Sequence, residues 1–124
     1  MIYLDTHVLV IIWLGAPEKL GTAARKALSD TDLRVSPAAI LELELLHEIR
    51  RLDPTANKLI SDLAEQVGLR VCDLPFSSVV HHALTEKWGR DPFDRLIVAN
   101  AKANHAALLT KDERIHKHYP RAIW

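Results

Sequence analysis

Residues 1–6 read MIYLDT, a short apolar run that ends at Asp5 and leads directly into a helix-forming stretch. A continuous apolar run of this length is typical of a buried strand in a parallel sheet. Similar runs predict strands at 33–36, 69–74 and 106–110, with a candidate edge strand at 122–124. Because amphipathic stretches alternate with these runs, we expect an α/β fold: a three-layer α/β/α sandwich with a short, mostly parallel central sheet.

The amphipathic stretches carry the start and stop signals of helices. Ser36-Pro37 and Asp91-Pro92 each combine an N-cap residue with proline at the first helical position, and Gly15 is expected to end the first helix. The expected helices span 6–14, 17–28, 37–52, 54–67, 76–88, 92–104 and 111–118. In open sheets of this class, ligands bind outside the carboxyl ends of the strands, so we expect the functional site there.

Composition indicates a single domain over residues 1–124 and identifies no partner by charge alone. Sixteen basic residues balance sixteen acidic ones, whereas proteins that only coat nucleic acid are usually strongly basic. The one cysteine, Cys72, allows no intramolecular disulfide and is expected to be an inert core residue. The longest apolar run, Val8–Leu14, is too short to cross a bilayer, and no signal peptide is visible, so we expect a cytoplasmic protein without membrane association.

Two aspartates stand just after predicted strands. Asp5 follows the first strand directly, and Asp112 comes two residues after the strand at 106–110. Both positions lie where an open α/β sheet builds its site. For either residue alone, the alternative is that its carboxylate only caps the next helix.

Glu42 is expected to lie within the apolar face of the helix over 37–52. A helical wheel at about 100° per residue places it on one face with Leu41, Leu45, Leu46, Ile49 and Leu52. Glu44 and Glu48 fall on the opposite, solvated side. A carboxylate among leucines needs a partner, because burying a lone charge is costly. The partner is either a cation bound by a site or an arginine in a buried salt bridge.

Asp94 shows the same pattern on the helix over 92–104. It shares a face with Ile97, Val98 and Ala101, at spacings of three, four and seven residues. The alternative is that Asp94 only stabilises the first turn of the helix dipole. Asp91 is expected to be an N-cap first and a functional residue second.

If Asp5, Glu42, Asp94 and Asp112 converge, their mutual repulsion must be compensated. Two carboxylates about 5 Å apart repel by roughly 3 kcal/mol at an effective dielectric of about 20. Summed over four groups, this would exceed the net stability of a typical domain, about 5–15 kcal/mol. Protonation or bound cations would relieve it, and an all-oxygen site suits Mg²⁺ or Mn²⁺. Thr6 and Thr110 could support such a site through their hydroxyl groups.

Four pieces of the sequence, in this order and spacing, are similar to the motifs of a known family. They are Ile2–His7, Ser36 with Glu42-Leu43, Asp91–Ala101 and Leu109–Asp112. The third piece, DPFDRLIVANA, is the most specific. On these motifs the chain resembles the PIN-domain nucleases, in particular the VapC-type toxins of prokaryotic toxin–antitoxin pairs.

The resemblance implies a PIN-like fold and endoribonuclease activity on RNA that depends on one or two Mg²⁺ or Mn²⁺ ions. It assigns the catalytic and metal-binding roles to Asp5, Glu42, Asp94 and Asp112. Thr110 matches a hydroxyl position near the site, and Asp91 adds a fifth carboxylate, as a ligand or only as a cap. Position 7, which is often small and polar or charged in the family, is His7 here. Family members usually form homodimers and are inhibited by a small cognate VapB-like antitoxin.

Other classes fit the sequence less well. An aspartate-based phosphatase would use Asp5 as its nucleophile, but it generally needs a second aspartate where this chain has His7. A non-catalytic PIN-like binding module is expected to have lost at least one of the four acidic positions. The histidine pairs His81-His82 and His116/His118 have poor spacing for zinc.

Basic residues near the acidic ends are candidates for holding the RNA backbone. They are Arg90, Arg95, Lys111 and Arg114. Each could equally be a solvated surface charge.

Overall fold

A computed structural model describes residues 1–29 and 32–124 and shows a five-stranded sheet with every pairing parallel. The strands are β1 (Ile2–Leu4), β2 (Leu33–Val35), β3 (Arg70–Val71), β4 (Ala107–Leu109) and β5 (Ala122–Ile123), in the spatial order β3-β2-β1-β4-β5. The α/β prediction with a parallel sheet is confirmed, including the edge strand at the end of the sequence. The predicted third strand, 69–74, is shorter than expected and pairs only over Arg70–Val71.

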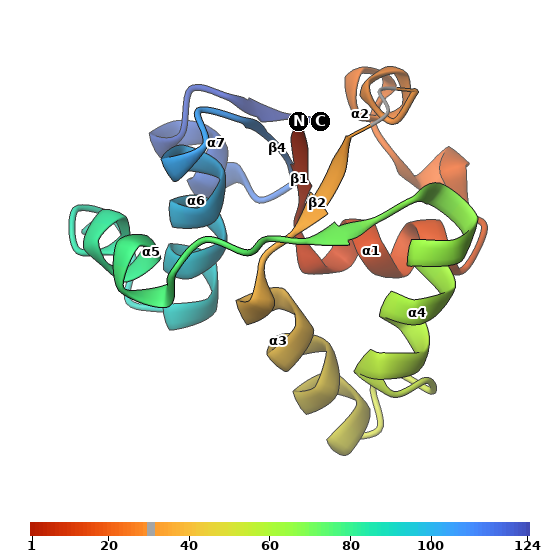
Figure 1. The fold of residues 1–124 in the computed structure, drawn as a ribbon. Coiled ribbons are helices and arrows are strands. Elements are labelled where there is room, and N and C mark those ends of the chain that lie inside the picture. Colours follow the sequence, from red (N-terminus) through yellow and green to blue (C-terminus); the bar gives the residue numbers. More distant parts are fainter. Residues whose placement is uncertain (30–31) are drawn as a thin grey trace.

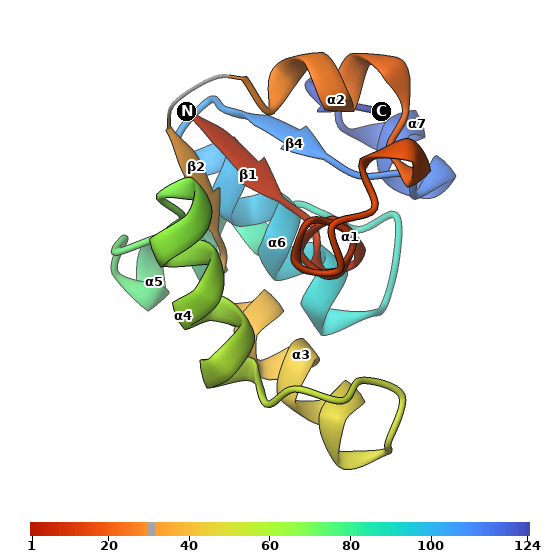
Figure 2. The ribbon, with the colours of Figure 1, turned by 90° about the vertical axis from the view of Figure 1, so that its right-hand side faces the viewer.

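The helices cover both faces of this sheet. They are α1 (Thr6–Trp13), α2 (Thr22–Ala27), α3 (Pro37–Glu48), α4 (Ala56–Val67), α5 (Phe76–Ala83), α6 (Pro92–Ala103) and α7 (Glu113–His118). In Figure 1, α1 and α4 lie on one side of the strands and α5 and α6 on the other. The turned view in Figure 2 shows α3 beyond the lower ends of the strands, where it packs against α1, α4 and α6.

β1 lies at the centre of the hydrophobic core. All three of its residues are buried, and Tyr3 is fully inaccessible. The Tyr3 hydroxyl donates a hydrogen bond to the Cys72 Sγ at 3.0 Å, and Asn104 Nδ2 donates to the Tyr3 oxygen at 2.7 Å. Cys72 is therefore a buried core residue, as expected. One large cluster of buried side chains extends from β1 to Tyr119.

Two predicted helices are interrupted or shortened. The stretch 17–28 is a 3-10 turn (Pro17–Lys19) followed by α2, because Leu20 adopts extended backbone and turns its side chain into the core. The stretch 76–88 is helical only to Ala83. Beyond it, the buried Glu86 carboxylate accepts from Trp88 Nε1 at 2.5 Å and from Lys102 Nζ at 2.9 Å, so the chain folds back onto α6.

α3 ends four residues earlier than the predicted Leu52, at Glu48, and the wheel misassigned part of its surface. Ala39 and Leu43 are its buried residues, whereas Leu41, Leu45 and Ile49 are exposed. The helical wheel assumes that the helix has one buried face. In the structure α3 packs against α1, α4 and α6, and these contacts bury Leu43 rather than Leu41 and Leu45. Glu44 was also expected to be a solvated charge, but it accepts a hydrogen bond from the Ala56 N–H at 3.0 Å.

Within residues 1–29 and 32–124, no helix combines the length and the apolar character that a membrane span requires.

Candidate active site

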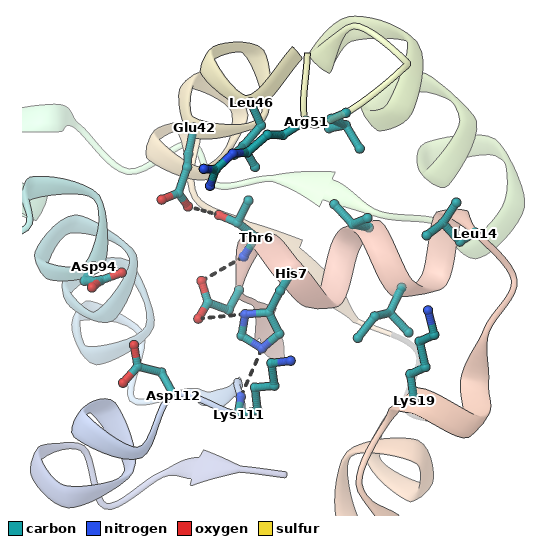
Figure 3. Close-up of a pocket in the computed structure, with 14 residues that line it drawn as sticks. Thr6, His7, Leu14, Lys19, Glu42, Leu46, Arg51, Asp94, Lys111 and Asp112 are labelled. Atoms are coloured by element: carbon teal, nitrogen blue, oxygen red, sulfur yellow. Dashed lines mark hydrogen bonds and ion pairs between the residues drawn. The ribbon is translucent and has the colours of Figure 1, made fainter. Parts of the chain in front are cut away.

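A cleft of about 700 Å³ opens at the carboxyl ends of β1 and β4, and all four predicted acidic residues line it. β1 pairs with β2 on one side and with β4 on the other, so the sheet order reverses here, which is the usual ligand site of an open α/β sheet. Figure 3 shows Glu42, Asp94 and Asp112 turned toward the same space from α3, α6 and the β4–α7 connection. The structure thus brings together residues that lie far apart in sequence.

Asp5 is the most firmly held of these carboxylates. It is 5% exposed, its Oδ1 accepts from the Thr6 N–H at 2.7 Å, and its Oδ2 accepts from the Thr110 hydroxyl at 2.6 Å. Its own N–H donates to the Leu109 carbonyl at 3.0 Å, which extends the β1–β4 pairing by one residue. Asp5 also caps α1, so the same carboxylate serves as the helix cap and lines the site. The orientation of its carboxylate is set by β1 and β4.

Glu42 extends from α3 to the start of α1. The Thr6 hydroxyl donates a hydrogen bond to Glu42 Oε1. None of the ion pairs among the described residues involves Glu42, so a buried arginine partner is not present there. Burial raises the pKa of Glu42, the Thr6 hydrogen bond opposes this, and the charges of Asp5 and Asp91 add to the rise.

Asp94 is the carboxylate whose ionisation is most unfavourable. It lies in the first turn of α6, partly buried. Burial, together with repulsion from Asp91, Asp5, Asp112 and Glu42, raises its pKa to about 7. Within the described residues, no hydrogen bond restrains its side chain. The Asp94 carboxylate is therefore poised to accept a proton or a cation.

Asp91 and Asp112 act as helix caps. Asp91 Oδ1 accepts from the backbone N–H groups of Phe93 and Asp94 at 2.8 and 3.2 Å, and Asp91 itself is exposed and outside the cleft lining. Asp112 Oδ1 accepts from the N–H groups of Arg114 and Ile115 at 2.8 and 3.2 Å. Asp112 nevertheless lines the cleft, so capping leaves its other oxygen available to the site.

His7 and Thr110 connect the two strands at the mouth of the cleft. Thr110 Oγ1 donates to Asp5 and accepts from the Asp112 N–H at 3.1 Å. His7 Nε2 accepts from the Lys111 N–H at 3.0 Å, which places the proton of the neutral ring on Nδ1, 3.6 Å from Asp5 Oδ2. Burial lowers the pKa of His7, although the charge of Asp5 opposes this.

Of the four basic residues predicted to hold RNA, only Lys111 lines the cleft. The Arg95 guanidinium donates to the Ala83 carbonyl from Nε and Nη2 at 3.3 and 3.0 Å, and so ties α6 to the end of α5. Arg90 donates to the Lys87 carbonyl at 3.5 Å, and the Arg114 side chain lies against Gly89.

The cleft also contains residues that the sequence pattern did not single out. Lys19 and Arg51 line it together with an apolar wall formed by Val10, Ile11, Leu14, Leu46 and Leu52. Neither cation stands in a recognisable motif: Lys19 ends the 3-10 turn, Arg51 lies between α3 and α4, and both reach the cleft only through the tertiary fold. The apolar run Val8–Leu14 contributes residues both to the core and to the cleft.

The donor set of the cleft suits a hard cation. The four acidic side chains offer only oxygen, as Mg²⁺ and Mn²⁺ prefer. Burial, together with repulsion between the carboxylates, raises the pKa values of Glu42 and Asp94, and a bound cation would relieve both effects. In the part of the chain that the structure describes, no three carboxylate, histidine or cysteine side chains already stand as a coordinating group. The chemistry of the residues fits a divalent cation, and closing the site around one requires side-chain adjustment.

Comparison with known domains matches residues 2–120 to the PIN domain. The chain belongs to the PIN-domain family. Within the family it is similar to ribonuclease VapC22 of Mycobacterium tuberculosis, with 34% identity over an alignment that covers 98% of this chain and 95% of that protein.

Solved structures of low sequence identity share the fold. A toxin–antitoxin complex from Klebsiella pneumoniae has a chain that superposes with a TM-score of 0.69 at 14% identity, covering 100% of this chain and 97% of that one. A chain of VapBC2 from Rickettsia felis, bound to a DNA fragment from its promoter, gives a TM-score of 0.66 at 18% identity, with coverage of 99% and 96%. These likenesses confirm the predicted PIN-like architecture.

Proposed function

We propose that this protein is an endoribonuclease that depends on Mg²⁺ or Mn²⁺ and serves as the toxin of a toxin–antitoxin pair. The observation that carries the proposal is the convergence of Asp5, Glu42, Asp94 and Asp112 on one cleft, with the pKa of Asp94 raised to about 7. The similarity to a protein named ribonuclease VapC22 supports RNA as the substrate.

The four acidic side chains differ in how firmly hydrogen bonds hold them in place. Asp5 is oriented by the Thr6 N–H and the Thr110 hydroxyl, and Glu42 by the Thr6 hydroxyl, so these two form the rigid part of the site. Asp94 and Asp112 would complete the ligands on the opposite side of the cleft. A bound divalent cation would activate water and stabilise the leaving oxygen of an RNA phosphodiester.

Geometry argues against the phosphatase alternative. An aspartate-based phosphatase would use Asp5 as its nucleophile together with a second aspartate two residues further on. The second position of that motif is His7, whose Nε2 already accepts from Lys111. All four acidic residues line the cleft, so the chain does not have the degenerate site expected of a non-catalytic binding module.

The structural neighbours also bear on the partners of this protein. Two of them are described as toxin–antitoxin or VapBC complexes, which supports a small VapB-like antitoxin as the inhibitor of this protein. We also propose that the protein forms a homodimer through apolar side chains exposed on α3 and α5.

The decisive experiment measures cleavage of total cellular RNA by the purified protein in Mg²⁺, Mn²⁺ or EDTA. Asp5→Asn and Asp94→Asn are compared with Asp73→Asn, which changes the same functional group at an exposed position outside the cleft. We expect cleavage in Mg²⁺ or Mn²⁺, none in EDTA, and a loss of at least about 100-fold in both site variants. The Asp73 variant should cleave like the parent.

Circular dichroism and calorimetry separate loss of function from loss of fold. Folded site variants that bind Mn²⁺ more weakly than the parent would tie the activity to the carboxylates. Cleavage that persists in EDTA, or is equal in all variants, would overturn the metal-dependent mechanism. The absence of both cleavage and Mn²⁺ binding in the folded parent would favour the binding-module alternative.

A further inference from the structure

The cleft has two chemically different halves. The acidic half holds the four carboxylates. The second half, here called the cation–apolar half, is formed by Lys19 and Arg51 on either side of the apolar wall that includes Val10, Leu14 and Leu46. Figure 3 shows Arg51 extending past Leu46 toward the side where Glu42 lies, and Lys19 on the other side of α1 beneath Leu14.

The end of α3 fixes the position of Arg51. The N–H of Arg50 donates to the His47 carbonyl at 3.0 Å and that of Arg51 to the Leu46 carbonyl at 2.9 Å, the two bonds of a Schellman motif. Arg50 adopts a left-handed conformation with φ 61°, which is unusual for a side chain other than glycine. Leu52, which follows Arg51, is buried. The chain thus reverses sharply, and Arg51 is directed back over the helix into the cleft.

The cations of the cleft are available for a ligand. Lys19 ends the 3-10 turn and is anchored by the buried Leu20 that follows it. Among the described residues, the ion pairs engage other cations, and none includes Lys19, Arg51 or Lys111. Lys111 stands at the opposite side of the acidic residues, beside Asp112. These three cations therefore flank the carboxylates on more than one side.

We propose that the cation–apolar half is the subsite for the nucleotide next to the cleaved phosphodiester in single-stranded RNA. The base and ribose pack on the apolar wall, while Arg51 and Lys19 bind the flanking phosphates. This inference rests on the proposed ribonuclease function and names the form of RNA that it acts on. Repeating phosphates match cations placed on both sides of a reactive centre, whereas an acidic peptide has no such regular spacing.

The size of the cleft selects the single strand. A volume of about 700 Å³ lies in the range of small-ligand pockets, so the hollow has room for an unpaired nucleotide but not for the width of a duplex inside it. Unpaired bases can turn toward an apolar wall, which bases stacked inside an A-form helix cannot do. The wall lacks aromatic side chains, so the packing favours no particular base by stacking.

The test measures the binding of a fluorescein-labelled unpaired RNA decamer by anisotropy, in Ca²⁺ and separately in EDTA, over a series of salt concentrations. Lys19→Gln and Arg51→Gln are compared with Lys117→Gln and Arg25→Gln, which remove the same charges from exposed positions outside the cleft. Each cleft variant should lose affinity about fivefold or more. The slope of log K against log salt should become shallower by about 0.7 for each phosphate that the variant no longer neutralises. The two controls should bind like the parent.

The apolar wall is tested in the same assay with Leu14→Ser, because Leu14 is 57% exposed and its replacement should leave folding intact. Affinity should fall about threefold or more with an unchanged salt slope, since no charge is removed. Leu84→Ser, at a leucine that is 59% exposed and outside the cleft, is the matched control.

Unchanged affinity in Lys19→Gln and Arg51→Gln would overturn the subsite, as would equal affinity of the parent for the decamer annealed to its complement. A glutamate-rich peptide that binds through Lys19 and Arg51, while RNA binding ignores them, would overturn it in favour of a peptide groove. RNA binding that depends on both residues, without cleavage in any metal, would support the subsite and contradict the proposed function.

Discussion

Asp94 is the residue in which the electrostatic cost of the site is concentrated. An aspartate in an unfolded chain titrates near about 3.9, whereas burial and four neighbouring carboxylates raise the pKa of Asp94 to about 7 in the folded protein. Between these two values the folded state holds the proton more tightly than the unfolded state does. The contribution of Asp94 to stability is therefore present at low pH and is lost as the pH rises through this window.

We predict that without metal the free energy of unfolding falls as the pH rises from about 4 to about 7, and that Asp94→Asn removes part of this fall. At pH 8 in EDTA the variant should be more stable than the parent by about 1–3 kcal/mol. Urea unfolding at several pH values measures this. Mg²⁺ should restore stability to the parent at pH 8 and do little for the variant. Parent and variant curves that stay parallel across this range would contradict the assignment.

At the residue scale, the sequence predicted the four acidic residues that line the cleft and one of its cations, Lys111, but not Lys19 or Arg51. Asp5 and Asp112 follow strands, and Asp94 shares a helix face with core residues, so each carries a local signal. Arg51 carries none, because its direction depends on the left-handed Arg50 before it. The sequence equally could not show that the Arg95 guanidinium is occupied by the Ala83 carbonyl.

At the scale of elements, helix ends place several functional residues. α1 closes with a Schellman motif in which Gly15 has φ 66°, and its N–H donates to the Ile12 carbonyl at 3.0 Å. An added Cβ at Gly15 would meet no atom within 4 Å, so replacing it tests backbone conformation alone. Gly21 differs, because its φ is ordinary and an added Cβ would overlap the backbone carbon of Trp124.

We predict that Gly15→Ala lowers the free energy of unfolding by about 1 kcal/mol, the cost of a left-handed alanine. Gly21→Ala should lower it by more, about 2 kcal/mol or above, since backbone must move to relieve the overlap. Urea unfolding of both variants provides the comparison, and Ala23→Gly in the exposed part of α2 controls for changes in glycine content. The reverse order of the two losses would show that the packing of Gly21 against the end of β5 yields easily.

The type of each element was predictable where local chemistry determines it. The boundaries were predicted wrongly where tertiary packing determines them. Ser36 and Asp91 cap their helices as expected, through hydrogen bonds to Ala38 and Phe93. The helix expected to reach Trp88 stops at Ala83, because the buried Glu86 finds its partner, Lys102, on another helix. Such a partner is visible only once the tertiary fold is known.

For the whole molecule, the parallel sheet was predictable from alternating strands and helices, but the strand order was not. The packing of the helices leaves an apolar face on the outside, formed by Leu41 on α3, Phe76 on α5 and Phe93 on α6 around a hollow of about 300 Å³. Leu41 is 56% and Phe76 69% exposed. An exposed apolar face of this kind usually marks a contact with another molecule.

We predict that this face joins two copies of the chain. Light scattering after gel filtration should give the mass of a dimer for the parent and of a monomer for the double variant Leu41→Asp/Phe76→Asp. Placing charges in an apolar contact opposes association strongly, so the dissociation constant of the dimer should rise by at least about 100-fold. Val67→Asp, at an exposed apolar position on α4, should remain dimeric. A monomeric parent at micromolar concentration would refute the prediction.

The pairing of β1 with β4 has a consequence for how the protein is made. Ile2 is in register with Ala107, so the central pair of the sheet joins segments that the ribosome produces far apart in time. A nascent chain that has emerged as far as α6 already carries Asp5, Glu42 and Asp94, but it lacks Asp112 and the Thr110 hydroxyl that orients Asp5. Contacts of such long sequence separation also form late in folding. The proposed ribonuclease site is thereby completed only after the segment that carries Thr110 and Asp112 has been translated.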